Sequence, residues 1–420
     1  MHARPMTPAR LDAWLALSGA RGVSPAALRL LLSAFGDVET LLAQPYRLLA
    51  EAAGSAIAGA VGAAAQADVR DARERTAAWC AQPGNALVAL DDPAYPSALL
   101  TMHDPPALLY VTGQLESLHA PSVAIVGSRN ATAQGAHDAG SFARELAAGG
   151  FAVVSGLALG IDAAAHRGAL RAEGVTIAVV GTGADLVYPA QHRALACEIA
   201  AHGAIVSEWP LGTQAKPAHF PQRNRLIAGL ARGVLVVEAA LRSGSLITAR
   251  LANEMGRDVF AVPGSIHAPL SRGCHQLIKD GAKLTETPDD IFDEFSATRP
   301  GREAASTGDI GGRLAPRRSR PTPAGTSASK PARTRPSHAS PPEPLPLFDA
   351  PLAASPAERP LSGAAARLLD ALGHAPAALE ILASRTEMDS PTLQAALLEL
   401  ELRGCIAALP GGRYARHTNR

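Results

Sequence analysis

The turn Gly127-Ser128-Arg129 is the first of three short segments whose side chains suit phosphate. It follows the apolar run VAIV, and a glycine there lets the backbone turn tightly at the end of a strand. Ser128 adds a hydroxyl, and the planar guanidinium of Arg129 has the geometry that binds phosphate oxygens. Taken alone, an arginine paired with a neighbouring loop explains this turn equally well.

A second segment, KPAHFPQRNRLIAGLA, concentrates basic side chains within ten residues. Basic residues with an aromatic ring among them are typical of a surface that contacts a nucleic-acid backbone and stacks on a base. The alternative is a solvated helix start whose phenylalanine belongs to the core. The candidates for binding in this segment are Lys216, Phe220, Arg223, Asn224 and Arg225.

The third segment, EAALRSGSLITA, places Ser243, Gly244 and Ser245 between an apolar run and the start of a helix. Backbone amides at a helix N-terminus bind anions, and the hydroxyl of Thr248 adds to those of the two serines. A capped helix without a ligand explains one serine but hardly three hydroxyls. The segment therefore indicates an anion site.

Groups suited to catalysis are sparse. Asp162 and His166 are four residues apart on one helical face, which fits a local structural role better than acid–base catalysis. Glu208 and Glu238 each end an apolar run, so a hydrolytic carboxylate stays open. Nucleophile-elbow, zinc-protease and Walker motifs are absent, as is the dinucleotide fingerprint G-x-G-x-x-G. We expect no enzyme, no cofactor and no metal.

Six apolar runs, separated by helix-length segments, predict the element that positions these side chains. Most runs are apolar on both faces, which is typical of a parallel sheet covered by helices on both sides. We predict a doubly wound, Rossmann-like α/β domain over residues 90–296. Ligands bind such sheets at the carboxyl ends of the strands, so the three segments should form one positively charged groove, with Tyr188 in its wall. The predicted strands are 123–127, 152–156, 176–181, 204–208, 233–239 and 258–264.

Two regions beside this domain differ in composition. Residues 1–80 are rich in alanine and leucine and predict a helical module of the SAM or helix-hairpin-helix kind, or a packing cap. One helix there should begin at Ser24-Pro25 and stop at Gly36. Residues 297–360 hold 13 of the 33 prolines, and 10 Lys and Arg against 5 Asp and Glu. That composition predicts a disordered basic linker.

Residues 361–416 predict a winged helix: three helices and then a hairpin, IAALPGGRYAR, with a Pro-Gly-Gly turn. The third helix carries Glu399 and Glu401 against Arg403, whereas a helix that faces DNA phosphates should be basic. We therefore expect this winged helix to bind protein.

The whole chain has 420 residues and a formal net charge of +1, so a polyanion must meet a local patch. Its four cysteines are isolated, which argues against a zinc site or a disulfide framework and fits a reducing compartment. No apolar run reaches the roughly 18 residues that span a membrane, and the start lacks a signal-peptide core. These features predict a soluble cytoplasmic protein with no membrane partner.

Six separated segments, in order, resemble the DNA-processing protein A family, DprA, also called Smf. The resemblance runs from about residue 90 to 295, the tail from LSGAAARLLDALG resembles the family's winged helix, and the first eighty residues match more loosely. The segments are VAIVGSR, VVSGLALGIDAAAH, GTGADLVYPAQHRAL, KPAHFPQRNRLIAGL, VLVVEAALRSGSLITARLANEMGRDVFAVPGS and GCHQLIKDGA.

The resemblance implies a homodimer that binds single-stranded DNA without sequence preference, protects incoming DNA in natural transformation and helps to load the RecA recombinase. It assigns the DNA site to the three segments above and adds Lys279 as a further candidate. Many members have a lysine after the Tyr-Pro, where this chain has Ala190, Gln191 and His192. A basic contact is absent there, or Arg193 replaces it.

Two other functions compete with this one. A nucleotide phosphoribohydrolase-like enzyme has a similar sheet, but RSGSLITA lacks the PGGxGT motif of those enzymes. A transcriptional reader would bind duplex through residues 361–416, and the acidic third helix argues against it. Aromatic residues make up 4% of the chain, so phosphate contacts should dominate affinity over base stacking.

Overall fold

The computed structural model divides the chain into two compact units, Met1–Asp349 and Ala350–Arg420. Most of the predicted linker, 297–360, lies outside the described residues, and the domain boundaries given above stay predictions. The described residues are 6–297, 345–346, 362–372, 377–386, 388, 390–402, 406–409 and 413–416.

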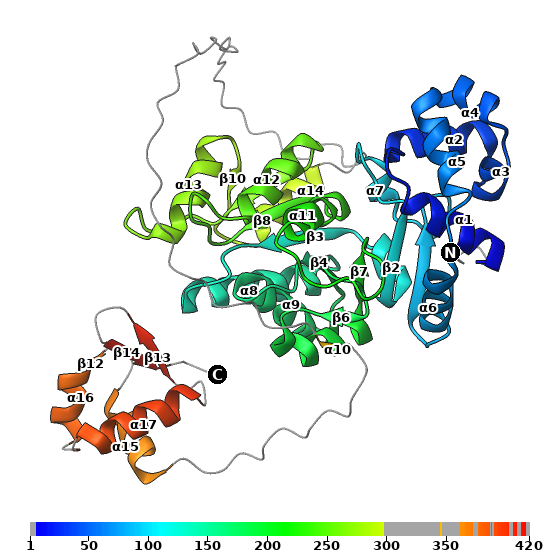
Figure 1. Ribbon diagram of the computed structural model, residues 1–420. Coiled ribbons are helices and arrows are strands. Elements are labelled where there is room, and N and C mark those ends of the chain that lie inside the picture. The colour runs from blue at the N-terminus through cyan, green and yellow to red at the C-terminus, as the bar shows by residue number, and fades with distance from the viewer. Residues whose placement is uncertain are drawn as a thin grey trace, which may run out of the picture. The chain divides into compact units, whose positions relative to one another are not determined.

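Helices fill the N-terminal part of the first unit (Figure 1). The hydroxyl of Ser24 accepts a hydrogen bond from the amide of Ala27 at 3.2 Å, Pro25 opens the helix, and Gly36 ends it at φ +89°. The start and stop predicted there are confirmed, because only glycine adopts that backbone readily. The helices are α1 Pro8–Ser18, α2 Pro25–Phe35, α3 Val38–Leu42, α4 Tyr46–Ala53, α5 Ser55–Ala64 and α6 Arg70–Cys80.

A nine-stranded sheet follows, in the order β1-β2-β7-β5-β4-β3-β8-β9-β10. Seven neighbouring strands of this order run parallel to one another: β7, β5, β4, β3, β8, β9 and β10. Strands β2 and β1 extend the sheet beyond β7 and are antiparallel to their neighbours. All six predicted strands are present, whereas three outer strands of the sheet, β1, β2 and β10, were not predicted. The strands are β1 Asn85–Ala89, β2 Leu108–Gly113, β3 Ser122–Val126, β4 Ala152–Ser155, β5 Thr176–Val179, β7 Ala204–Ser207, β8 Gly233–Val236, β9 Asp258–Ala261 and β10 Lys283–Leu284.

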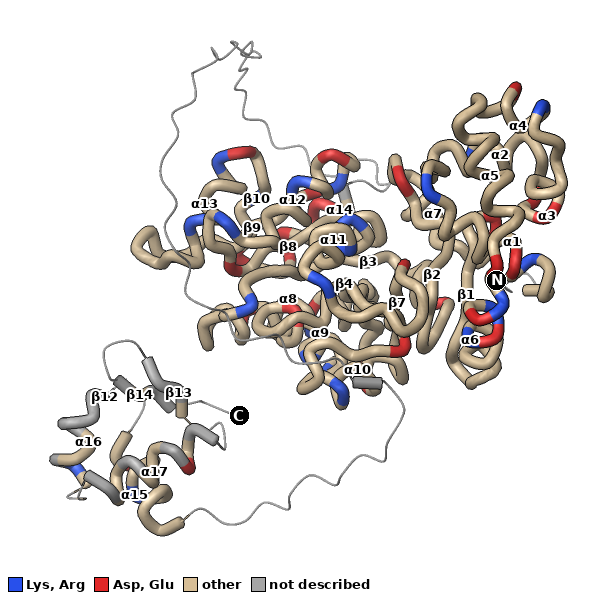
Figure 2. The backbone as a smooth tube through the Cα atoms, in the orientation of Figure 1, with Lys and Arg blue, Asp and Glu red and all other residues tan. Residues whose placement is uncertain are grey.

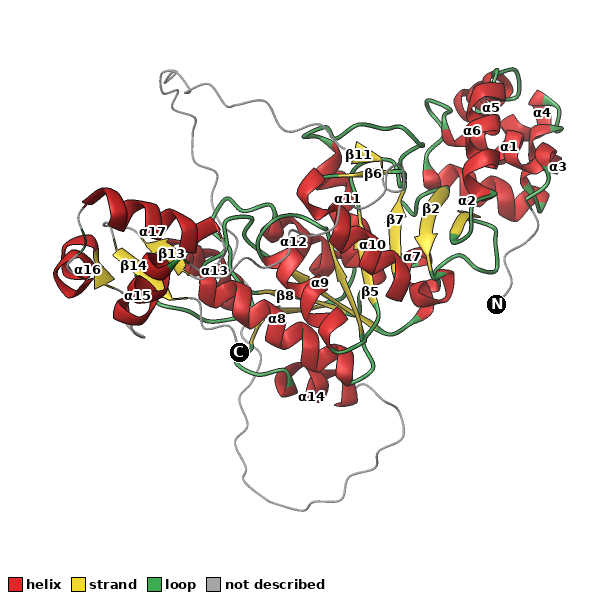
Figure 3. Cartoon of the chain, turned by 90° about the horizontal axis from the view of Figure 1, so that it is seen from below, coloured by secondary structure: helices red, strands yellow, loops and turns green. Residues whose placement is uncertain are grey.

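Helices cover both faces of this sheet (Figure 3), which confirms the doubly wound α/β prediction. Along β3, Val123 and Ile125 pack with α8 and α9, while Ala124 and Val126 belong to the core on the opposite face with α11 and α12. A separate strand pair joins β6 Leu186–Val187 to β11 Leu345–Pro346. The helices are α7 Ser97–Leu100, η1 Leu115–His119, α8 Ala133–Ala148, α9 Ile161–Arg171, η2 Ala190–His192, α10 Arg193–His202, α11 His219–Leu230, α12 Ser245–Glu254, η3 Pro269–Ser271, α13 Arg272–Lys279 and α14 Asp289–Ala297.

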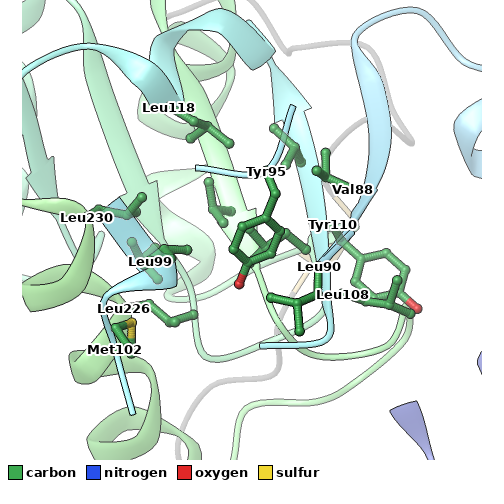
Figure 4. Close-up of a cluster of buried hydrophobic side chains, with 14 of the residues drawn as sticks. Val88, Leu90, Tyr95, Leu99, Met102, Leu108, Tyr110, Leu118, Leu226 and Leu230 are labelled. Atoms are coloured by element: carbon green, nitrogen blue, oxygen red, sulfur yellow. The ribbon is translucent and has the colours of Figure 1, made fainter. Parts of the chain in front are cut away.

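One hydrophobic cluster runs from the N-terminal helices through β1 and β2 to α11. Figure 4 shows the part of this cluster between β1, β2 and α11. Leu226 and Leu230 of α11 belong to it, together with Leu99 of the short helix α7 and Met102 just after that helix. Full burial of a leucine stabilises the fold by roughly 1.5–3 kcal/mol, so this contact holds α11 firmly against the sheet. The helix that carries Phe220, Arg223 and Asn224 is therefore held in a fixed position on the sheet.

The second unit is a winged helix, as predicted. Its helices are α15 Gly363–Leu372, α16 Leu379–Thr386 and α17 Ser390–Leu402, and β12 Ala377–Ala378, β14 Arg413–Arg416 and β13 Ile406–Leu409 form a small sheet in that order. Leu368, Leu382 and Leu397 are buried in its core. The predicted Pro-Gly-Gly turn lies outside the described residues. No helix in the described part of the chain is long and apolar enough to cross a membrane.

Candidate nucleic-acid interface

The central strands β3 and β8 lie side by side, and the chain departs from them in opposite directions. From β3 it proceeds through β4 and β5 to β7, and from β8 it proceeds through β9 to β10. This is the topological switch point of a doubly wound sheet, where a crevice opens beyond the carboxyl ends of the strands. The turns at 127–129 and 240–245 follow these two strands.

A cavity of about 700 Å³ lies at this switch point. Its wall contains three guanidinium groups, those of Arg129, Arg223 and Arg242, against one carboxylate, Asp162, so its charge is positive. Ten of the residues predicted for the site line it: Gly127, Ser128, Arg129, Phe220, Arg223, Asn224, Ser243, Gly244, Ser245 and Thr248.

The turn after β3 is held from two sides. The amide of Ser128 donates to the carbonyl of Glu238 at 2.8 Å, and the carbonyl of Ser128 accepts from the amide of Ile161 at 3.1 Å. A side chain on Gly127 would meet Ile161 at 2.6 Å, so the position accepts only glycine. The exposed Arg129 guanidinium lies 5.1 Å from the centre of the Phe220 ring, an arrangement that orients the cation without neutralising it.

The turn after β8 presents hydroxyls at the start of α12. The Oγ atoms of Ser243 and Ser245 are 2.7 Å apart, and the side-chain amide Nδ2 of Asn224 donates to the carbonyl of Gly244 at 3.3 Å. Ser243 Oγ also accepts from the amide of Ser245 at 3.4 Å, so part of its role is to cap the helix. The N-terminus of a ten-residue helix thus opens into a cavity lined by arginines, a combination that attracts phosphate.

Arg223 is buried at the back of the cavity, with 4% of its surface exposed. Its Nη2 donates to the carbonyl of Gly156 at 3.0 Å, and a side chain on that glycine would collide with the guanidinium. Burial lowers the pKa of Arg223 to about 10, an effect that Asp162 opposes and Arg129 reinforces. Arg223 therefore keeps its positive charge at neutral pH.

Asp162 and His166 contact different partners. Asp162 accepts from the amides of Gly156 and Ala158 at 3.1 and 3.4 Å, and burial raises its pKa while Arg223 opposes that rise. His166 lies 2.7 Å from the hydroxyl of Thr176, and burial lowers its pKa to about 3. A neutral buried imidazole without contact to the carboxylate fits a structural role.

Both strand-end carboxylates are also engaged. Glu208 forms an ion pair with Arg225, and Glu238 accepts from the amide and hydroxyl of Thr132 at 2.9 and 2.6 Å. Neither residue lines the cavity. Among the described residues, no group of three or more His, Cys, Asp or Glu is placed to bind a metal ion.

Three predicted site residues lie outside the cavity wall. Arg225 points to Glu208 and Asp104 and is largely buried by them. Lys216 is exposed beside the lining residues Ala215 and Pro217, and Lys279 is exposed at the end of α13. Arg242 in the wall was not predicted, although a cation directly before Ser243 was a usable signal.

Fold and site together define a class: a doubly wound α/β protein with a positively charged cavity at its switch point, joined in one chain to a winged helix. Residues 86–296 match the model of the family "DNA recombination-mediator protein A", and residues 352–412 match the "DprA winged helix domain". The chain belongs to this DNA recombination-mediator protein A, or DprA, family. The resemblance drawn from the six sequence segments is confirmed.

Individual relatives agree with this assignment. The chain is 38% identical to protein Smf of Escherichia coli over 358 residues, which cover 84% of each chain. It is 50% identical to DNA processing protein DprA of Streptococcus pneumoniae over 206 residues, 49% of this chain and 72% of the relative. The X-ray structure of DprA from Streptococcus pneumoniae superposes with a TM-score of 0.60 at 37% identity, covering 69% of this chain and 99% of the other.

Proposed function

We propose that this protein binds single-stranded DNA without sequence preference, with the backbone in the switch-point cavity. The observation that carries the proposal is the convergence of Arg129, Arg223 and Arg242 with the α12 N-terminus on one cavity. Cations and free amides recognise phosphate and are indifferent to base identity. Phe220 and Tyr188, whose ring centres are 5.7 Å apart, offer the aromatic surface on which a base stacks.

The first test is fluorescence anisotropy of a labelled oligothymidylate and a matched duplex across a salt series, with Arg129→Glu as the variant. The reversed charge should weaken binding to the single strand about tenfold or more and lower the salt slope by about 0.7 for each phosphate that the variant no longer binds. Arg47→Glu, an exposed change on α4, is the control and should leave binding intact. Equal affinity for strand and duplex would contradict the proposal.

Family membership supports a wider role as a recombination mediator that loads RecA during DNA uptake and natural transformation. Because RecA acts in the cytoplasm, we propose that this protein is cytoplasmic. We also propose that it acts as a homodimer. The check is RecA ATPase activity on single strands coated with a single-strand-binding protein. The full chain should shorten the lag before RecA begins to hydrolyse ATP, and the Arg129→Glu variant should not. The molar mass from light scattering tests whether the protein is a dimer.

We further propose that the protein is not an enzyme. The engagement of Glu208 with Arg225, and of Glu238 with Thr132, supports this, because neither carboxylate is free to activate water. The competing function is a nucleotide phosphoribohydrolase. Release of free base from nucleoside monophosphates by the purified protein would favour that enzyme and overturn this proposal.

A further inference from the structure

A second cavity, of about 420 Å³, lies between α9 and α10. Two exposed arginines, Arg167 and Arg171, and one acid, Glu198, are the charged groups of its wall. Figure 2 shows blue Lys and Arg segments beside α9 and α10. The other lining residues are Leu170, Gln191, Ala194 and Leu195.

Arg167 and Arg171 are four residues apart on α9, which places like charges on adjacent turns of one face. Like charges at this spacing destabilise a helix by roughly 0.2–0.5 kcal/mol. Within the described part of the chain, neither guanidinium forms a hydrogen bond or an ion pair. The dipole of α9 favours Arg171 in the last turn but does not explain Arg167, one turn earlier. A bound anion would relieve the repulsion.

The same two segments form walls of both cavities. On α9, Asp162 lines the switch-point cavity, and Arg167 and Arg171 line the second. At 1.5 Å per residue these arginines lie about 7.5 and 13.5 Å further along the helix axis. In the segment after β6, Tyr188 lines the first cavity and Gln191 the second. Since a helix turns by about 100° per residue, the two arginines lie on a different face of α9 from Asp162, and the segment from Tyr188 to Gln191 is the link between the two cavities that a chain-like ligand would follow.

We propose that a DNA single strand held in the switch-point cavity continues past Tyr188 and Gln191 into the α9–α10 cavity, where Arg167 and Arg171 bind its backbone phosphates. This proposal rests on the proposed function. The segment after Tyr188 carries no cation before Arg193, so α9 supplies the positive charge on this side. Leucine and alanine make up the rest of the α9–α10 wall apart from Gln191 and Glu198, which fits contact with the backbone better than the reading of bases.

The test compares the full chain with the double variant Arg167→Gln/Arg171→Gln on oligothymidylates of about 3 and about 30 nucleotides, one shorter and one longer than the roughly 4–16 nucleotides that single-strand sites commonly span. At about 3.4 Å per nucleotide the shorter strand is too short to leave the switch-point cavity and reach both arginines, so its affinity should not change. For the longer strand the salt slope should fall by about 1.4, because two bound phosphates contribute about 0.7 each.

The matched control is Arg47→Gln/Arg70→Gln, which removes the same charge from exposed positions on α4 and α6. An equal reduction in the control would overturn the path, because net charge would then explain the effect. An unchanged slope in the α9 variant, with Arg129→Glu still weakening the short strand, would overturn the path and leave the proposed function standing. Salt-insensitive binding of both strands by the wild type would overturn both.

Discussion

At the scale of single residues, Arg223 has an unusual position for a cation. It is almost entirely buried, it donates to a backbone carbonyl, and its nearest acid, Asp162, is itself buried and hydrogen-bonded to two amides. Burying two charges costs more than their attraction usually returns. Such a pair therefore fits a role in holding positive potential at the cavity better than a role in stability.

Replacement of this cation should destabilise the fold in a pH-dependent way. Arg223→Met leaves Asp162 buried without its counter-charge, and the free energy of unfolding at pH 7 should fall by about 3–5 kcal/mol. Because burial raises the pKa of Asp162, the folded state takes up this proton at a higher pH than the unfolded chain. The stability that protonation of Asp162 contributes is therefore present at low pH and lost as pH rises through that raised pKa.

Without Arg223 the pKa of Asp162 rises further, so the loss in free energy of unfolding relative to the wild type should shrink as pH falls from 7 towards 4. Urea unfolding of the variant and the wild type at several pH values measures this loss. Leu226→Ala is the control, since it opens a cavity costing about 2–5 kcal/mol and changes no titrating group. If the stability loss of Arg223→Met is as independent of pH as that of Leu226→Ala, the pKa of Asp162 does not depend on this guanidinium.

At the scale of elements, the turn after β3 is positioned by the loop before α9. Gly160, at φ +75°, allows this loop to pass so closely that a side chain there would lie 2.3 Å from the carbonyl of Ser128. Gly160→Ala should therefore displace the turn, cost about 1–3 kcal/mol of stability and weaken binding to single strands.

Thermal unfolding and anisotropy measure the two effects of Gly160→Ala. The control is Gly59→Ala in the middle of α5, where an added methyl group meets nothing within 4 Å. It should stabilise that helix by up to about 1 kcal/mol and leave DNA binding unchanged. Normal affinity in Gly160→Ala would mean that the turn tolerates displacement and that Arg129 acts independently of its position.

At the scale of the whole molecule, the two compact units suggest separable roles. The net charge of +1 makes general attraction to DNA weak, and the cavity in the first unit supplies the local cations. In the second unit, Glu399 of the third helix accepts from the hydroxyl of Ser362 at 2.5 Å, so one of its two acids helps to hold α15.

A chain ending at residue 349 should therefore keep its affinity for a short oligothymidylate within about threefold, because compact units fold on their own contacts. Anisotropy with the shortened and full chains measures this. Residues 361–416 alone should show no sequence-specific binding of duplex. A large drop in affinity on shortening would assign part of the single-strand site to the winged helix.

The sequence by itself determined six of the seven parallel strands, because strands buried on both faces are apolar throughout, and the helix starts, because caps are local. The strands β1 and β2 were missed because β2 pairs with β7, far along the chain, and β10 was missed because it has only two residues. Tertiary structure alone decided which cations meet. Arg223 and Arg225 are two residues apart, and about 100° of helical rotation per residue sends them to opposite sides of α11, one to the cavity and one to Glu208. The sequence therefore shows that basic residues are close together along the chain, but the rotation of the helix and its packing on the sheet decide in which direction each side chain points.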